Sequence, residues 1–355
     1  MQLAGLDIQR KEIELYPFHC QASRIGEEAK RLSASPLFSG KVLAVFSNGI
    51  YLSGCAGEML WVACEDLPMH RRSITASFQP HSVCVGQRFF AHGTCLHIGE
   101  ALAIDLDQAE EWKPLTLGPE QAGPLGAVND SVCRLITTIP TFNRNAGLGQ
   151  TIPVILAIAD GRNPGTILLD SLATQAIDPI LAIARSCLNE DIAHIANTGK
   201  ELIGLGPGLT PSGDDFLGGV LFAAHSLKMT YPGEFFWDEQ PFRELIDWSY
   251  TRTNPISHAI LSDLSLGHGP EPLHDIVSSL LSGKDWRKVM LSINQLLRMG
   301  HTSGWDILAG LLTGMLLVRG KVHPAFITLS RGGRGRAGRP RQCQWGNSPC
   351  PGDGG

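Results

Sequence analysis

Two aspartates follow a loop of unusual composition in the segment Gly204–Gly219, which reads GLGPGLTPSGDDFLGG. Its glycines allow backbone angles that other residues avoid, and its prolines stiffen the loop. Ser212 is suited to cap a helix that would carry Asp214 and Asp215 in its first turn, where the helix dipole favours negative charge. The segment therefore predicts a ligand site at a helix N-terminus, and the alternative is an ordinary capped helix after a tight turn.

Two kinds of ligand would suit such a site. Free backbone amides at a helix start can bind phosphate or another small anion. The two carboxylates could instead hold a metal ion or orient a polar group of a substrate. No lysine follows the glycines as in a Walker A loop, and no G-x-G-x-x-G pattern opens a helix after a strand, so neither nucleotide-binding motif is predicted.

A second copy of the motif lies downstream. The stretch Thr210–Gly219 aligns without a gap with His301–Gly310, so that its serine, second aspartate and closing glycine match Ser303, Asp306 and Gly310. We expect two similar helix N-termini facing one cleft, with glycines that let the helices pack closely. A chance likeness between two capped helices is the alternative.

The segment between the two copies, YTRTNPISH, adds polar side chains. Arg252 could bind a carboxylate or phosphate in bidentate fashion. The alternative for this segment is a helix start with Asn254 as the cap and Pro255 in the first position. His301, just before the second motif, is predicted as a general acid or base, and a purely structural histidine is the alternative.

The candidate site follows from these motifs. The predicted catalytic residues are Asp215, Asp306 and His301. The residues predicted to bind substrate or phosphate are Gly206, Gly208, Thr210, Ser212, Gly213, Asp214, Arg252, Asn254, Ser257, Thr302, Ser303 and Gly304. No residue is assigned as a metal ligand, because the histidines lack zinc spacing, although a divalent metal is kept as an alternative cofactor.

The charge balance argues against nucleic acid as a partner. The chain of 355 residues has a formal net charge of −5, yet its last segment, Ser330–Gly355, holds five arginines and one aspartate, which leaves −9 for the rest. An acidic body lacks the clustered Lys and Arg that phosphate contacts need. Nine cysteines without C-x-x-C spacing, no apolar leader and no apolar run of about 20 residues predict a cytoplasmic protein away from the membrane.

The apolar pattern predicts an α+β protein of two domains and a tail. Residues 1–125 should form a small β barrel or sandwich, and residues 126–329 a mostly helical domain with the glycine-rich site. Strands are predicted at 42–46, 50–53, 59–63, 73–78, 82–85, 89–92 and 101–106, with Asn48-Gly49 turning the first hairpin. Ile152–Ala159 fits a strand or a helix, and most later segments show helical spacing, among them 188–205. Residues 330–355 are predicted to be a disordered tail.

The motif GLGPGLTPSGDDFLGG, with the later Thr-Ser-Gly-x-Asp-x-Leu-x-Gly, resembles the AllH-like family. Its namesake is a subunit of the oxamate carbamoyltransferase of allantoin catabolism. The resemblance extends from the β-rich N-terminal third to about Leu329, and the Arg-Gly tail departs from it. It implies a heteromeric enzyme with FdrA-like and AllG-like partner subunits, which converts oxalurate and phosphate to oxamate and carbamoyl phosphate.

The resemblance also suggests roles for the candidate residues. The amides after Ser212 and Ser303 would hold phosphate or a carboxylate, Arg252 would neutralise charge, and Asp215 and Asp306 would orient amide N–H groups or a metal. Two other functions stay open at this point. The chain could be a non-catalytic scaffold that stabilises its partners, or an enzyme or sensor for another small phosphorylated anion.

Overall fold

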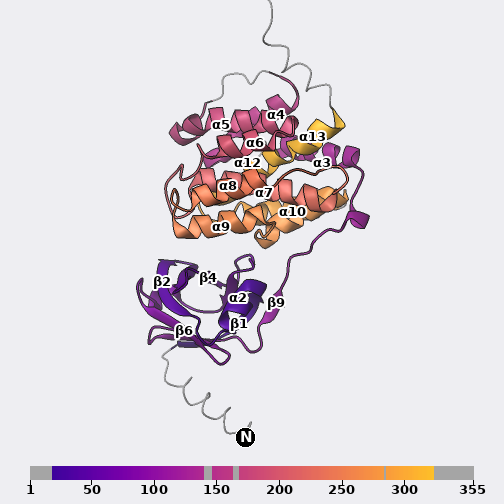
Figure 1. Ribbon diagram of the computed structural model, residues 1–355. Helices are drawn as coiled ribbons and strands as arrows, with labels where there is room; N and C mark the ends of the chain where they lie inside the picture. The colour runs from indigo at the N-terminus through magenta and orange to yellow at the C-terminus, as the bar shows by residue number, and fades with distance from the viewer. Residues whose placement is uncertain (1–17, 140–145, 163–167, 284, 324–355) are drawn as a thin grey trace, which may run out of the picture.

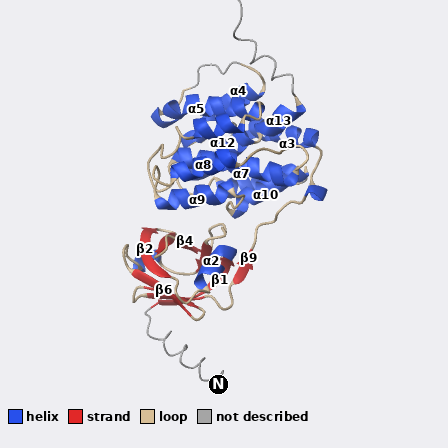
Figure 2. Ribbon diagram, in the orientation of Figure 1, coloured by secondary structure: helices blue, strands red, loops and turns tan. Residues whose placement is uncertain are grey.

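The computed structural model of the chain describes residues 18–139, 146–162, 168–283 and 285–323. Strands dominate the part before residue 113 and helices the part after it (Figure 1, Figure 2). The fold is therefore α+β, a β barrel followed by a helical domain, as the sequence predicts. The predicted tail, residues 330–355, lies outside the described residues.

Eight strands close into the barrel in the order β5-β4-β3-β2-β6-β7-β8-β1, because β1 pairs with both β8 and β5, and β9 adds to the outside of β1. A short helix, α2 (Glu27–Ser33), follows β1. The strands are β1 (Phe18–Gly26), β2 (Ser39–Phe46), β3 (Gly49–Gly54), β4 (Met59–Cys64), β5 (Ser73–Ala76), β6 (Arg88–His92), β7 (Cys95–Ile98), β8 (Leu102–Asp105) and β9 (Glu110–Trp112).

Local sequence signals found most of these strands but not all. The hairpin of β2 and β3 is confirmed, with Phe46 opposite Gly49. Its turn differs from the expected type, because neither Asn48 nor Gly49 has a positive φ. The strand predicted at 82–85 is wrong, since a 3-10 turn at Pro80–Ser82 ends in a loop there. β1 was missed because its pairing is with strands far along the chain, which no local pattern reveals.

The helical domain is built around α7 (Ser212–Thr230) and α12 (Ser303–Gly314), which lie in its middle (Figure 1). Ile152–Ala159 is a helix, while the helix expected over 188–205 shrinks to α6 because the chain turns after Gly199. The other helices are α3 (Leu125–Thr138), α4 (Ile152–Ala159), α5 (Ser171–Leu188), α6 (Ile192–Gly199), α8 (Gln240–Ser249), α9 (Pro255–Ser265), α10 (Glu271–Ser282), α11 (Trp286–Leu296) and α13 (Leu316–Val322).

Helices α7 and α12 run parallel and touch backbone to backbone. A Cβ on Gly310 would lie 1.8 Å from the carbonyl oxygen of Phe216, and a Cβ on Gly219 would lie 2.2 Å from that of Ile307. Only glycine permits these approaches. The predicted close packing at the two matched glycines is thus present, and it sets both helix N-termini side by side.

The barrel and the helices each have a hydrophobic core, and polar contacts join the two parts. Arg72, next to β5, donates two hydrogen bonds to Asp263 of α9, at 2.5 and 2.7 Å. Arg24 of β1 does the same to Glu271 of α10, at 3.1 and 2.8 Å. The boundary between residues 125 and 126 stays a prediction, and the ion pairs hold the barrel under α9 and α10 (Figure 1).

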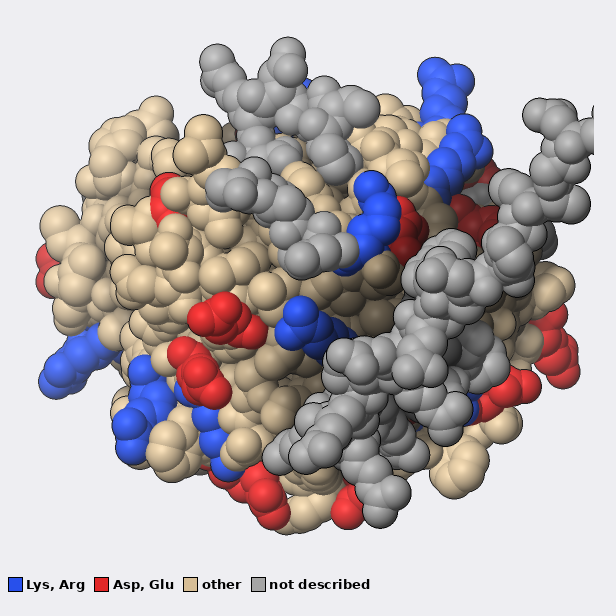
Figure 3. Space-filling view, turned by 90° about the horizontal axis from the view of Figure 1, so that it is seen from above, with Lys and Arg blue, Asp and Glu red and all other residues tan. Residues whose placement is uncertain are grey.

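Figure 3 shows the upper face of the helical domain, on which the charged groups are scattered. Lys and Arg side chains alternate there with Asp and Glu among uncharged residues. The described part of this face therefore lacks the basic patch that nucleic acid would need. No helix among the described residues is long and apolar enough to cross a membrane.

Candidate functional site

The glycine-rich loop before α7 is fastened by Asp214. This aspartate is 2 % exposed, and its Oδ1 accepts a hydrogen bond of 2.7 Å from the amide of Gly204. Its Oδ2 accepts hydrogen bonds from the hydroxyls of Thr253 and Ser257. Both carboxylate oxygens are satisfied, so Asp214 ties the loop to the start of α9.

Asn254 fastens the other side of the loop. Its Oδ1 caps α9 by accepting from the amides of Ile256 and Ser257, which is the alternative interpretation of this segment, and its Nδ2 donates to the carbonyl oxygen of Leu209. Gly204, Gly206 and Gly208 have φ angles of 76°, 115° and 97°, which explains the glycines of this loop.

The second aspartate of each motif copy is linked to the opposite helix. The hydroxyl of Ser303, at the start of α12, lies close enough to Asp215 of α7 to oppose the rise of its pKa. Reciprocally, the hydroxyl of Ser212, at the start of α7, opposes the rise of the pKa of Asp306 in α12. Thr210 closes the arrangement, because its Oγ1 lies 3.0 Å from Oγ of Ser303. The two motif copies therefore build one cluster with approximate twofold symmetry.

The serines do not cap their own helices, which corrects the prediction. The capping positions are Pro211 and Thr302, and neither side chain makes a capping hydrogen bond. The serine hydroxyls are used across the helix pair instead, because the close approach of α7 and α12 brings each within reach of the other's aspartate.

The backbone amides that directly follow Ser212 and Ser303 are occupied. The amide of Gly213 donates to the carbonyl oxygen of Leu205 at 2.9 Å, and that of Gly304 donates to Met299 at 3.2 Å. Each of these glycines lies close to a preceding carbonyl group. A Cβ on Gly213 would lie 2.0 Å from the oxygen of Leu202, and a Cβ on Gly304 would lie 2.0 Å from the oxygen of Leu296. Neither amide is left to receive an anion.

Burial raises the proton affinity of both central carboxylates. Burial, with the neighbouring charges of Asp306 and Asp214, raises the pKa of Asp215 well above its usual value against the hydrogen bonds of Ser303 and Thr210. Burial likewise raises the pKa of Asp306 to about 6, although hydrogen bonds from the amide of Leu148 and from Ser212 and Thr302 oppose it. Negative charge on this pair therefore costs free energy, and the hydrogen-bond donors around the pair offset that cost only in part.

One oxygen of each central aspartate has no partner. Asp215 is 3 % exposed and Asp306 is fully buried, and Oδ2 of each makes no hydrogen bond with any residue that the structure describes. Buried carboxylate oxygens are normally hydrogen-bonded because desolvation is expensive. Two such oxygens in one cluster indicate that the cluster is built for something other than stability.

The sequence did not indicate two further neighbours of the pair. The amide of Leu148, in the 3-10 turn Gly147–Thr151, donates to Oδ1 of Asp306 at 2.6 Å. The charge of Asp215 also acts on Tyr51 of β3, whose pKa is raised to about 12, mainly by burial. Tyr51 packs between the rings of Phe46 and Trp61, so an aromatic row of the barrel lies near the helix starts. No local motif marks either neighbour.

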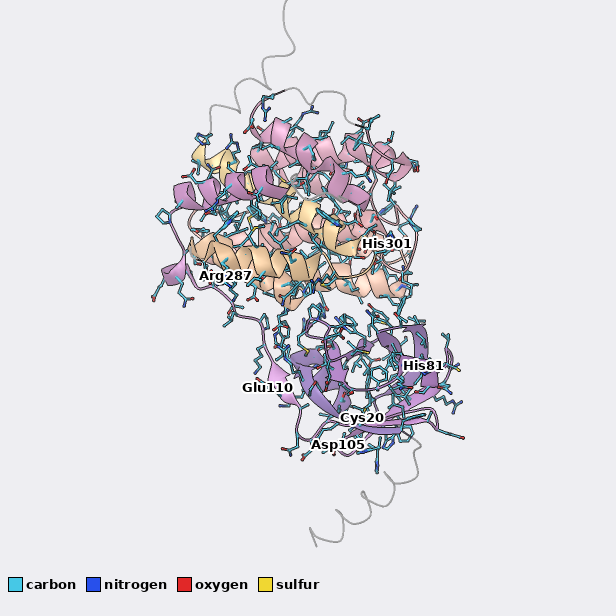
Figure 4. The ribbon with its side chains drawn as sticks, turned by 180° about the vertical axis from the view of Figure 1, so that it is seen from behind. Cys20, His81, Asp105, Glu110, Arg287 and His301 are labelled. Carbon is cyan, nitrogen blue, oxygen red and sulfur yellow. The ribbon has the colours of Figure 1, made fainter. Side chains whose placement is uncertain are left out.

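Two candidate residues point elsewhere. The guanidinium of Arg252 is exposed and lies 4.3 Å from the centre of the Trp248 ring. His301 is exposed in the turn before α12, at the side of the helical domain (Figure 4). The structure therefore gathers Thr210, Ser212, Asp215, Thr302, Ser303 and Asp306, while Asp214, Asn254 and Ser257 hold the loop.

Two cavities of the molecule lie away from this cluster. One of about 250 Å³ is lined by residues of α7, α8 and α9, among them His225 and Lys228, and by Trp237 of the loop between α7 and α8, but by none of the candidate residues. Another of about 270 Å³ lies on the barrel beside Phe38. Among the described residues, no group of three or more His, Cys, Asp or Glu side chains forms a metal site. Both central aspartates are buried in this conformation.

Comparison with known proteins relates this cluster to a family model. No solved structure matches the chain. Residues 202–315 match the family model of AllH, described as an oxamate carbamoyltransferase subunit. That span contains both motif copies, the serines and both central aspartates. The predicted resemblance to the AllH family is thereby confirmed over residues 202–315, and its extent into the β-rich N-terminal third and to Leu329 stays a prediction.

Proposed function

We propose that this chain is the substrate-binding subunit of a carbamoyltransferase that converts oxalurate and phosphate to oxamate and carbamoyl phosphate. The observation that carries the proposal is the reciprocal serine–aspartate cluster with two free carboxylate oxygens, inside the segment that matches AllH. A cluster that leaves buried acceptors without donors lowers stability, and proteins retain such features where a ligand supplies what is missing.

The substrates suit these acceptors. Oxalurate, oxamate and carbamoyl phosphate each carry N–H groups, and carboxylate oxygens accept such hydrogen bonds strongly. Ser212 and Ser303 hold the two aspartates in place, and Thr210 holds Ser303. The oxygens of Asp215 and Asp306 would then position the substrate, directly or through a bound ion. FdrA-like and AllG-like subunits are the proposed partners, and they would complete the enzyme.

Reconstitution with the partner subunits tests this function. Oxalurate phosphorolysis would be measured with this chain, without it, and with Asp215→Asn or Asp306→Asn in its place. We expect activity only when this chain is present, and a loss of roughly 100-fold in each variant, because misplacing a substrate costs about that much. Asp178→Asn is the matched control, since Asp178 is exposed on α5.

The same assay separates the alternatives. Activity that needs the chain but is unchanged by both central variants would mean that it acts as a scaffold. Activity of the partner subunits alone, at the full rate, would remove this chain from the reaction.

A further inference from the structure

The electrostatics of the cluster present a conflict with the chemistry of its proposed substrates. Phosphate, oxamate and oxalurate are anions, whereas Asp215 and Asp306 bring two carboxylates to one place. The amides of Gly213 and Gly304, which could have attracted an anion, are bonded to carbonyl oxygens. Arg252, the predicted counter-charge, lies over Trp248 instead. Added positive charge would therefore favour the binding of an anion beside the aspartate pair.

The groups around the pair indicate what kind of positive charge fits. Oδ2 of each aspartate is buried and without a partner among the described residues. The side chains that hydrogen-bond the pair are hydroxyls, from Thr210, Ser212, Thr302 and Ser303. Oxygen donors of this kind select hard cations, while zinc and copper prefer imidazole and thiolate.

The number of carboxylates narrows the choice further. Magnesium is commonly bound through one or two carboxylates and completes its coordination with water and with phosphate oxygens of the substrate. The aspartate pair offers two buried carboxylates. A bound divalent ion would also reverse the local charge and so attract an anion.

We propose that the free Oδ2 oxygens of Asp215 and Asp306 bind one hard divalent cation of the magnesium class, which in turn binds the phosphate or carboxylate of the substrate. The cation site stands on the geometry of the cluster, and only its role toward the substrate rests on the proposed function. The serines act as positioning residues, because each holds the opposite helix's aspartate at the shared ion.

Thermal unfolding of the full chain tests the ion site without any enzyme assay. The melting temperature would be measured with MgCl₂ near ten times its dissociation constant, against NaCl of equal ionic strength. We expect MgCl₂ to raise it by about 2–4 °C in the wild type and in Asp178→Asn. Asp215→Asn and Asp306→Asn, which keep an oxygen but lose the charge, should abolish the shift. An unchanged shift in both variants, or none in the wild type, would overturn the site.

A second measurement covers the case in which the variants do not fold. Water-proton relaxation of Mn²⁺ with the wild-type chain should reveal one site that Mg²⁺ displaces, and the lack of such a site would overturn the proposal. The reconstituted assay separates the two ideas. Ion binding without oxalurate phosphorolysis would support the cation site and contradict the proposed function. Phosphorolysis that EDTA does not affect would support the proposed function and contradict the cation site.

Discussion

Asp215 and Asp306 occupy the same position in two copies of one helix start, and the serine hydroxyl of the other copy opposes the rise of the pKa of each. The site is therefore a property of the helix pair and not of either motif alone. Its geometry depends on how closely α7 and α12 approach, which the matched glycines Gly219 and Gly310 set. Changes far from the carboxylates should act on the site through this packing.

A methyl group between α7 and α12 should separate them. In Gly310→Ala the new Cβ would meet the carbonyl oxygen of Phe216 at 1.8 Å, so the helices must move apart. We expect a loss of about 3 kcal/mol in the free energy of unfolding, measured by urea denaturation. Gly126→Ala is the control, because its Cβ would have no neighbour within 4 Å and should be neutral or stabilising. Equal stability of the two variants would contradict the packing account.

Adjacent aspartates of the first motif should differ in their effect on stability. Asp214→Ala leaves the amide of Gly204 and the hydroxyls of Thr253 and Ser257 without their acceptor, so we expect a loss of about 3 kcal/mol or more. Asp215→Asn removes a partly uncompensated buried charge and should cost far less. Urea unfolding of both variants at pH 7.5 measures this, and the reverse order would show that the roles are exchanged.

The attachment of the barrel to the helical domain should depend on Arg72. Asp263 is 1 % exposed and has Arg72 as its bidentate partner, with Arg71 3.7 Å away. Arg72→Ala leaves this carboxylate buried with weaker compensation, and we expect a loss of about 3 kcal/mol. The double variant Arg72→Met with Asp263→Leu should recover most of it. A double variant that is less stable than Arg72→Ala would show that the pair does not act as a unit.

Acid should weaken the fold through a buried histidine. Burial, with the charges of His70 and His268, lowers the pKa of His274 to about 4, and its Nε2 accepts a hydrogen bond from the amide of Gly269. The pKa of His274 in the folded state lies below its unfolded value near 6.5. The stability contributed by the neutral imidazole is therefore complete above pH 6.5 and is lost as the pH falls toward 4. His274 alone accounts for about 3 kcal/mol over that range.

The comparison variant is His274→Gln, which keeps an acceptor for the amide of Gly269. The free energy of unfolding, measured with urea between pH 7 and pH 4.5, should fall less steeply for this variant than for the wild type. Burial also lowers the pKa of His70 to about 4, so part of the slope should remain. Identical slopes for both proteins would exclude His274 as a source of the pH dependence.

The sequence predicted the architecture well because its signals are local. Asn-Gly turns, apolar alternation and the change to helical spacing each depend on a few neighbouring residues. The alternative interpretation of Asn254 as a helix cap also depends on local signals, and the structure confirms it. The repeat in the motif likewise predicted two similar helix starts, which the parallel packing of α7 and α12 brings together.

The fine structure of the site was beyond such signals. In the sequence, a serine shortly before an aspartate is typical of a helix cap. Only the approach of the second helix shows that Ser212 and Ser303 each act on the aspartate of the opposite helix. The contributions of Leu148 and Tyr51 come from distant parts of the chain without any motif. The direction of Arg252 depends on Trp248, whose exposed ring receives it.

A crystal structure of the chain with Mn²⁺ and oxamate tests the central claim most directly. The account predicts one anomalous peak within about 2.5 Å of Oδ2 of both Asp215 and Asp306, with oxamate bound to that ion. Oxamate in the cavity beside His225 and Lys228, with no manganese at the aspartate pair, would contradict it.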